Sequence, residues 1–168
     1  VRSPEQTVRL IANVNQLVKR QGDLVAYAAT HATPRDFAEA LAKEIPNLGG
    51  PQTARKRIWM YLRWMVREYP DLRIFDFFHP RQLYLPLDTN VGKVAVCLGI
   101  LDAPSASFQW TSVEKVTEFA RTLFPDDPAK MDYPFFTLGR QLNPKTLDLE
   151  SLVAAVDSIL KRHGLQAA

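Results

Sequence analysis

The stretch IPNLGGPQTARKRIWMYLRWMVR, residues 45 to 67, joins a tight turn to an apolar and aromatic run. Apolar residues recur in the run with the spacing of one buried helical face: Ala54, Ile58, Tyr61 and Met65. This period predicts an amphipathic helix from Pro51 to about Glu68, with the basic side chains Lys56, Arg63 and Arg67 on its opposite side. A helix, a short turn and a second helix therefore form the centre of the predicted fold.

Similar helix signals recur along the whole chain. Capping residues stand directly before proline at Ser3-Pro4, Thr33-Pro34 and Asp127-Pro128, an arrangement that opens helices. We expect helices over residues 4–20, 23–29, 34–44, 51–68, 89–100, 113–123, 128–140 and 149–164, the sixth of them capped by Ser112. Strand signals are almost absent. The sequence therefore predicts an all-α fold, a compact domain of seven to eight helices that spans the 168 residues.

The composition is typical of a globular domain, with 46% hydrophobic and 23% charged residues. No apolar run has the length of a membrane span, and the N-terminal residues do not resemble a secretory signal. Cys97 is the single cysteine, which excludes an internal disulfide and cysteine-rich metal sites. We expect a cytoplasmic, nucleoid-associated monomer with no membrane contact, metal or cofactor. The chain begins with Val rather than Met, which leaves open that N-terminal sequence is missing.

The positive charge is concentrated in one segment. Residues 45 to 67 contain five basic residues and no acidic one, so this segment carries +5 and the rest of the chain −2. Such a distribution suits a polyanion such as nucleic acid, although a solvated surface gives the same pattern. The turn with Gly49 and Gly50, before a helix start, could present backbone amides to a DNA phosphate, or it could be an ordinary connection between helices.

Two motifs in this order carry a resemblance to known proteins. The Ile-Pro-Asn-Leu-Gly turn resembles the hairpin of the helix-hairpin-helix (HhH-GPD) base-excision DNA glycosylases, which typically reads Leu-Pro-Gly-Val-Gly. LPLDTNVGKVA, residues 85–95, resembles their second signature, in which an aspartate heads a helix. The chain also resembles an uncharacterised all-helical family through KRIWMYLRWMVR, PLDTNVGKVAVCLG and DPAKMDYPFFTLG. That family is similar to the archaeal 8-oxoguanine glycosylase branch.

The resemblance implies a single glycosylase domain over residues 1–168, with Asp88 as the catalytic aspartate. In the commonest bifunctional members the nucleophilic lysine occupies a position that corresponds to Gln52 here. In the archaeal branch the lysine lies deeper, about as far before the aspartate as Lys56 lies before Asp88. We therefore assign Lys56 as the nucleophile. Taken alone, Asp88 would be a helix cap and Lys56 a surface lysine with a packed stem.

The remaining candidate residues concern DNA binding. The resemblance places DNA contacts at the turn and the basic residues beside it: Asn47, Gly49, Gly50, Arg55 and Arg57. Both arginines could instead form structural ion pairs. Asp132 lies in the third motif and is a candidate for the base pocket, although an acidic residue in a first helical turn also favours the helix dipole. The three tryptophans are expected to be structural, because aromatic residues at helical spacing usually belong to the core.

Together these features predict a DNA repair glycosylase with apurinic/apyrimidinic (AP) lyase activity, which excises 8-oxoguanine from double-stranded DNA through a lysine Schiff base. A non-catalytic helix-hairpin-helix DNA-binding protein is the first alternative. An all-helical protein-interaction domain, whose basic face is incidental, is the second.

Overall fold

The computed structural model describes residues 3–50, 52–105 and 107–164. These residues form eight α-helices and no named strand, so the predicted all-α fold is confirmed. The helices are α1 (Pro4–Gln21), α2 (Leu24–Ala29), α3 (Pro34–Glu44), α4 (Lys56–Val66), α5 (Thr89–Cys97), α6 (Trp110–Leu123), α7 (Asp132–Gly139) and α8 (Leu149–Arg162). Short 3-10 helices also connect them: η1 (Pro46–Leu48), η2 (Pro80–Gln82) and η3 (Pro128–Met131).

Side-chain caps fix several helix starts where the sequence predicts them. The Thr33 side chain accepts from the Asp36 amide, and the Asp36 side chain accepts from the Thr33 amide, so the pair forms a capping box at α3. Asp88 and Asp148 cap α5 and α8 in the same way, by accepting amide hydrogen bonds of the first turn. These bonds satisfy backbone donors that a helix start leaves free.

The start of α4 is where the prediction is wrong. The helix begins at Lys56 rather than Pro51, because the residues before it pair with another part of the chain. Thr53 and Gln109 form an isolated antiparallel bridge. On either side of it, the Ala54 amide donates to the Phe108 carbonyl and the Trp110 amide donates to the Gln52 carbonyl, each at 2.9 Å. This pairing consumes the backbone groups that a helix would use.

The buried face of α4 also differs from the predicted one. Ala54 and Ile58 are buried, but Tyr61 and Met65 are only partly so. The fully buried positions of the helix include Trp59 and Leu62, which the predicted stripe omits. α4 packs against α3 on one side, and the Trp59 ring contacts the rings of Tyr84 and Trp110 on another. Because these neighbours contact α4 on the side of Trp59, the buried face of the helix is centred on Ile58, Trp59 and Leu62.

The predicted starts of two later helices are also corrected. α6 begins at Trp110 rather than after Ser112. The single helix expected over residues 128–140 is divided into η3 and α7. Asp127 precedes η3 but makes no capping hydrogen bond, since its carboxylate accepts from the Arg67 guanidinium instead.

Two hydrophobic cores organise the described residues. The N-terminal core contains Leu17, Ala28, Phe37, Ala38, Leu41, Ile45, Ile58, Trp59, Leu62, Val66, Phe75, Phe78, Leu83 and Ala129. The C-terminal core contains Ala54, Leu85, Leu87, Val91, Val94, Ala95, Cys97, Leu101, Phe108, Val113, Val116, Ala120, Met131, Phe135, Leu142, Leu152 and Ala155. Tyr84 and Trp110 pack against both cores.

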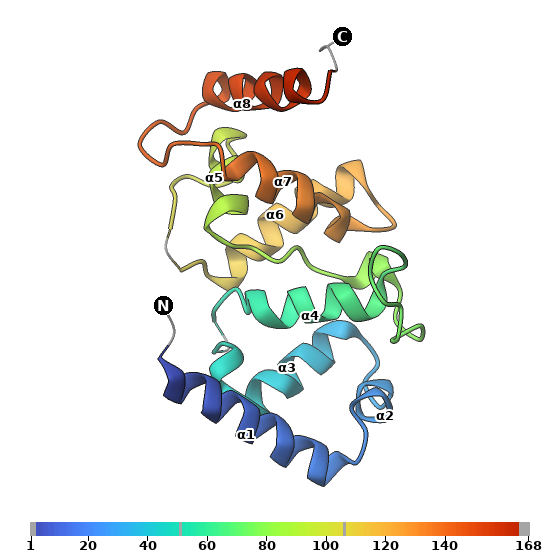
Figure 1. Cartoon of the computed structure of the whole chain (residues 1–168). Coiled ribbons are helices and arrows are strands. Elements are labelled where there is room, and N and C mark those ends of the chain that lie inside the picture. The colour runs from blue at the N-terminus through green and yellow to red at the C-terminus, as the bar shows by residue number, and fades with distance from the viewer. Residues whose placement is uncertain (1–2, 51, 106, 165–168) are drawn as a thin grey trace.

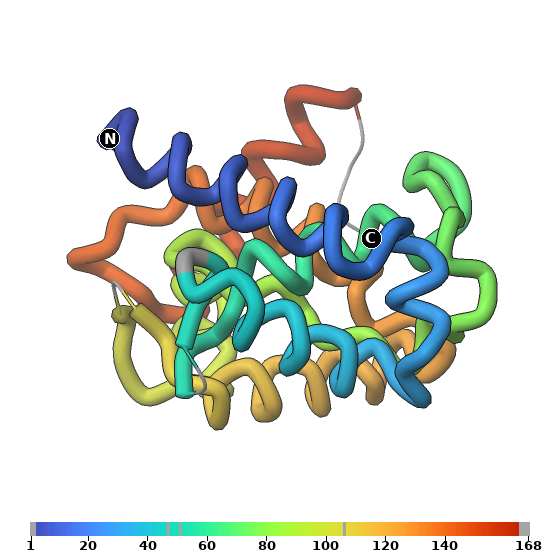
Figure 2. Tube along the Cα trace, turned by 90° about the horizontal axis from the view of Figure 1, so that it is seen from below, coloured from blue at the N-terminus to red at the C-terminus, as the bar shows by residue number. Residues whose placement is uncertain are grey.

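The arrangement of the helices places α4 between these two cores. Figure 1 shows the helices stacked from α1 at the bottom, through α3 and α4, to α8 at the top. Seen from below in Figure 2, α6 runs along one edge of the molecule. The buried residues of α4 belong to the N-terminal core, whereas those of α5 belong to the C-terminal core.

α5 and α7 lie in close contact at a glycine. A Cβ atom on Gly139 would lie 2.0 Å from the Asn90 carbonyl oxygen, a separation at which the two backbones would have to move apart. The Lys93 amine donates to the carbonyl oxygens of Gly139 and Leu142, at 2.8 and 3.1 Å. The end of α7 is therefore fastened to α5 close to Asp88.

We predict that Gly139→Ala lowers the free energy of unfolding by about 2 kcal/mol or more, because the obstructing atoms are backbone and cannot rotate away. Urea unfolding measures the change. Tyr133→Ala, at a 73% exposed position of the same helix, is the control and should stay within about 0.5 kcal/mol of wild type. An equal, small effect of both substitutions would show that α5 and α7 do not approach each other this closely.

Candidate active site

The structure brings Lys56 and Asp88 together, although 31 residues separate them in the chain. The Lys56 Nζ lies 3.3 Å from the Asp88 Oδ2. Lys56 is the first residue of α4 and Asp88 is the N-cap of α5, so two helix starts face each other. The Lys56 side chain is 36% exposed and that of Asp88 is 17% exposed, which leaves the amine accessible to a ligand.

The two oxygens of Asp88 have separate roles. Oδ1 accepts hydrogen bonds from the amides of Asn90 and Val91, both at 2.9 Å, and so caps α5. Oδ2 faces the Lys56 amine. The capping function therefore orients the carboxylate and leaves one oxygen for the lysine.

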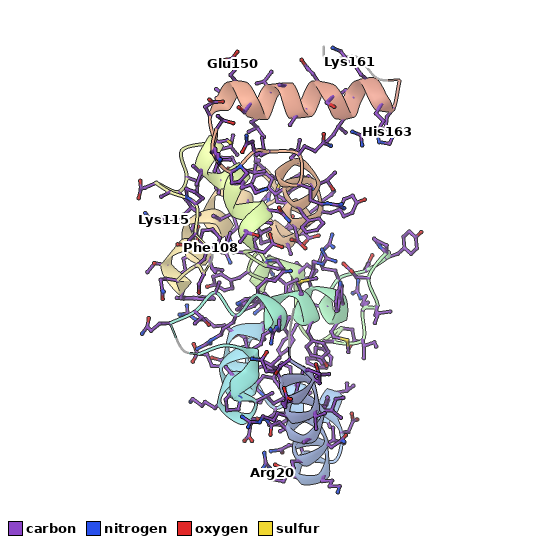
Figure 3. All side chains as sticks on the ribbon, turned by 60° about the vertical axis from the view of Figure 1, so that its left-hand side comes forward. Arg20, Phe108, Lys115, Glu150, Lys161 and His163 are labelled. Carbon is purple, nitrogen blue, oxygen red and sulfur yellow. The ribbon has the colours of Figure 1, made fainter. Side chains whose placement is uncertain are left out.

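A cavity of about 560 Å³ opens beside this pair. It is lined by Leu48, Gly49, Thr53, Ala54, Arg55, Lys56, Arg57, Met60, Leu87, Asp88, Thr89, Ser107 and Phe108. The turn after α3, the start of α4 and the start of α5 thus share one cavity. Phe108, labelled in Figure 3, belongs to the segment before α6. Its ring packs directly over Gly92 of α5, where a Cβ atom would lie 2.2 Å from the ring.

The turn after α3 is closed by hydrogen bonds to one of its own carbonyl groups. The Gly50 carbonyl accepts from the Thr53 amide, the Thr53 hydroxyl and the Arg55 Nε, at 3.2, 2.9 and 3.3 Å. Gly49 has a φ of 127°, a value that favours glycine. Arg55, predicted to contact phosphate, therefore also closes the turn.

The predicted DNA-contact residues are only partly gathered at the cavity. Gly49, Arg55 and Arg57 line it, whereas Gly50 is not among its lining residues. The side chain of Asn47 lies outside the described part of the chain. Of the predicted DNA-contact residues, the two arginines at the start of α4 and one glycine of the turn thus share the cavity.

Asp132 does not line the cavity but belongs to a chain of ion pairs on the basic side of α4. It begins α7, is 7% exposed and accepts a hydrogen bond from Arg63. Arg63 also lies 3.7 Å from Asp71, which pairs with Arg67 at 2.6 Å. Arg67 in turn contacts Asp127 at 2.8 Å. Carboxylates from elsewhere in the chain therefore offset much of the local positive charge that the sequence indicates.

Asp132 is still coupled electrostatically to the Lys56–Asp88 pair. Burial raises the pKa of Asp132, the charge of Arg63 opposes this rise, and the neighbouring Asp88 carboxylate adds to it. The sequence offers no local signal for this coupling, nor for the place of Phe108 in the cavity wall, because both depend on contacts between distant segments.

The comparisons with known proteins place the chain in one family. It belongs to a family described as "Protein of unknown function (DUF2400)", whose model matches residues 2–141. This range includes both helix starts of the candidate site and ends before α8. Comparisons with curated proteins and with solved structures found no match. The similarity to DNA glycosylases remains a prediction from the sequence motifs.

No described helix is both long and apolar enough to cross a membrane.

We predict that Asp88→Ala lowers the free energy of unfolding by about 1 kcal/mol through loss of the α5 cap, whereas Asp88→Asn stays within a few tenths, because asparagine caps about as well as aspartate. Urea unfolding measures both. The same two substitutions at Asp148, which caps α8 through the Ser151 amide at 2.7 Å, are the matched control. If Asp88→Asn destabilises as much as Asp88→Ala, the cap is not what Asp88 contributes to stability.

A second prediction concerns the pH dependence of stability at Asp132. Because its pKa is raised in the folded state, its contribution is full below the unfolded value of about 3.9 and is lost as pH rises through the folded value. Relative to Asp132→Asn, wild type should lose stability with rising pH, by at most about 1.4 kcal/mol per pH unit. Urea unfolding of both proteins from acid to neutral pH measures this. A difference that instead grows in favour of wild type would show that Arg63 outweighs burial.

Proposed function

We propose that this protein is a DNA glycosylase and AP lyase that excises an oxidised base from double-stranded DNA, with 8-oxoguanine as the expected lesion. The observation that carries the proposal is the Lys56 amine, 3.3 Å from the Asp88 carboxylate at a cavity beside the turn after α3. In this proposal the protein acts as a monomer at the cytoplasmic nucleoid and needs no cofactor.

The pair supplies the two groups that base excision requires. The ammonium of Lys56 must first lose its proton, and the Asp88 Oδ2 lies near enough to accept it. The amine lone pair then attacks C1′ of the sugar and forms a C1′–N bond. The bond between C1′ and the base breaks, and the base leaves with the electron pair of that broken bond and takes up a proton. A carboxylate beside C1′ stabilises the positive charge that develops there.

A lysine nucleophile also explains the proposed strand cleavage. The new C1′–N bond becomes an iminium when the sugar ring opens and O4′ takes up a proton. Loss of a proton from C2′ then expels the 3′ phosphate, and hydrolysis of the imine returns the lysine. The whole sequence of steps requires only an amine, proton transfer and, for the final hydrolysis, water.

The surroundings of the pair suit a nucleotide turned out of a duplex. The cavity of about 560 Å³ is within the range of about 300–1,000 Å³ typical of small-molecule sites. Its wall is apolar at Met60, Leu87 and Phe108, as a base face requires. Arg57 at the start of α4 lines the same cavity, which makes its guanidinium a candidate contact for a flanking phosphate.

A non-catalytic DNA-binding role is the competing proposal. Asp88 Oδ1 already caps α5, so a cap with a structural ion pair would account for both side chains without chemistry. An experiment that traps the lysine distinguishes these two proposals.

We predict that borohydride traps a covalent adduct between wild type and duplexes that carry either 8-oxoguanine opposite cytosine or an abasic site. Lys56→Gln should reduce the adduct to background, because glutamine has no nucleophilic lone pair. Asp88→Asn should slow trapping by about 100-fold or more, the usual effect of removing one electrostatic stabiliser. The adduct is measured by gel electrophoresis under single-turnover conditions.

The matched control is Lys115→Gln, an exposed lysine of α6 that Figure 3 labels, and it should trap like wild type. An adduct that persists in Lys56→Gln would assign the nucleophile to another amine. Salt-dependent DNA binding without any adduct would establish the non-catalytic role. Absence of DNA binding even at low salt would leave a protein-interaction domain.

A further inference from the structure

Arg55 has an unusual backbone conformation directly before the candidate nucleophile. Its φ and ψ are 45° and 37°, in the left-handed region. Within the described ranges, Arg55 and Arg73 are the non-glycine residues with positive φ. Residues with a Cβ atom seldom adopt this conformation, and where they do the surrounding structure holds them in it.

The left-handed conformation of Arg55 connects two segments whose backbones are held by hydrogen bonds. Before Arg55, the backbone is held by pairing with the segment before α6, in which the Ala54 amide donates to the Phe108 carbonyl. After it, α4 begins at once, because the Arg55 carbonyl accepts from the amides of Ile58 and Trp59, at 2.9 and 3.2 Å. One left-handed residue makes the change of direction between them.

The turn lies directly against this residue. A Cβ atom on Gly49 would lie 2.8 Å from the Thr53 Oγ1, so glycine is what lets the turn close on Thr53, and the Arg55 Cα would lie in ordinary contact with that Cβ atom at 3.4 Å. The Arg55 side chain returns to the turn through its Nε bond to the Gly50 carbonyl. Hydrogen bonds of the preceding segment, of α4 and of the Arg55 side chain itself thus hold the backbone of Arg55 in this conformation.

We infer that Arg55 is a positioning residue, and that its left-handed backbone sets the direction from which the Lys56 amine meets Asp88. Lys56 is the next residue and the first of α4, so a change at Arg55 would rotate Lys56 away from the Asp88 Oδ2. The guanidinium is secondary to this role. The catalytic part of the inference rests on the proposed function, whereas the contact between Lys56 and Asp88 can be tested without DNA.

Two substitutions separate the backbone from the side chain. Arg55→Gly and Arg55→Val both remove the guanidinium, but glycine accepts the left-handed region and valine does not. Arg55→Gly should trap an abasic-site duplex within about threefold of wild type, and Arg55→Val should be slower by about tenfold or more, since a displacement near 1 Å can cost about 100-fold in rate. Both variants should bind a duplex with a non-reactive abasic analogue with the same Kd.

A measurement without DNA accompanies the kinetics. In protein labelled with ¹³C-lysine, the Lys56 Cε signal is assigned by its loss in Lys56→Gln. Its shift on Asp88→Asn reports the contact between the two side chains. This response should be preserved with Arg55→Gly and lost with Arg55→Val. Arg73→Gly and Arg73→Val, at the other left-handed arginine, are the matched controls and should leave both readouts unchanged.

The outcomes are distinct. Equal trapping and equal NMR responses for Arg55→Gly and Arg55→Val overturn the inference, as does loss of the response with Arg55→Gly. If wild type forms no adduct, the proposed function fails, and the NMR response still decides the role of Arg55. Should Arg55→Val not fold, Arg55→Asn and Arg55→Ala replace the pair. Asparagine enters the left-handed region more readily than alanine, so Arg55→Asn should retain the response better.

Discussion

The short pairing between residues 52–54 and 108–110 is the constraint on which the site depends. It delays the start of α4, brings the segment before α6 against the turn after α3, and places Phe108 both in the cavity wall and against Gly92 of α5. A few backbone hydrogen bonds therefore connect the turn and the starts of three helices. In the helix that the sequence pattern predicts from Pro51, by contrast, Lys56 would be an interior position.

The charges of α4 show how burial changes the meaning of a basic segment. Counted along the sequence, residues 45–67 are strongly positive. In the fold, Arg63 and Arg67 are matched by carboxylates from other segments, with side chains only 16% exposed. The basic residues at the start of the helix, Arg55, Lys56 and Arg57, line the cavity instead. A nucleic-acid surface would therefore be small and centred on that helix start.

Much of the fold could be predicted from local signals, because helix starts are fixed by nearby residues. Thr33, Asp88 and Asp148 cap helices at the expected positions. The start of α4 could not be predicted, since the pairing that sets it joins residues more than 50 positions apart. The same limit applies to the site: motif spacing indicated Lys56 and Asp88, but the pairing of Asp132 with Arg63 depends on how α7 meets α4. Whether the pair is catalytic stays a prediction.

Two ion pairs connect α4 to the starts of α5 and α7. The proposed reaction would change one of these pairs and not the other. Lys56 meets Asp88 at the start of α4, and Arg63 meets Asp132 two turns further along, about 10 Å away on the helix axis. Two such attachment points prevent α4 from swivelling against α5 and α7. In the proposed reaction Lys56 gives up its charge, and that attachment weakens. Arg63 takes no part in the proposed chemistry and keeps its charge, so its hydrogen bond to Asp132 still holds α4 against α7 while the contact between Lys56 and Asp88 weakens.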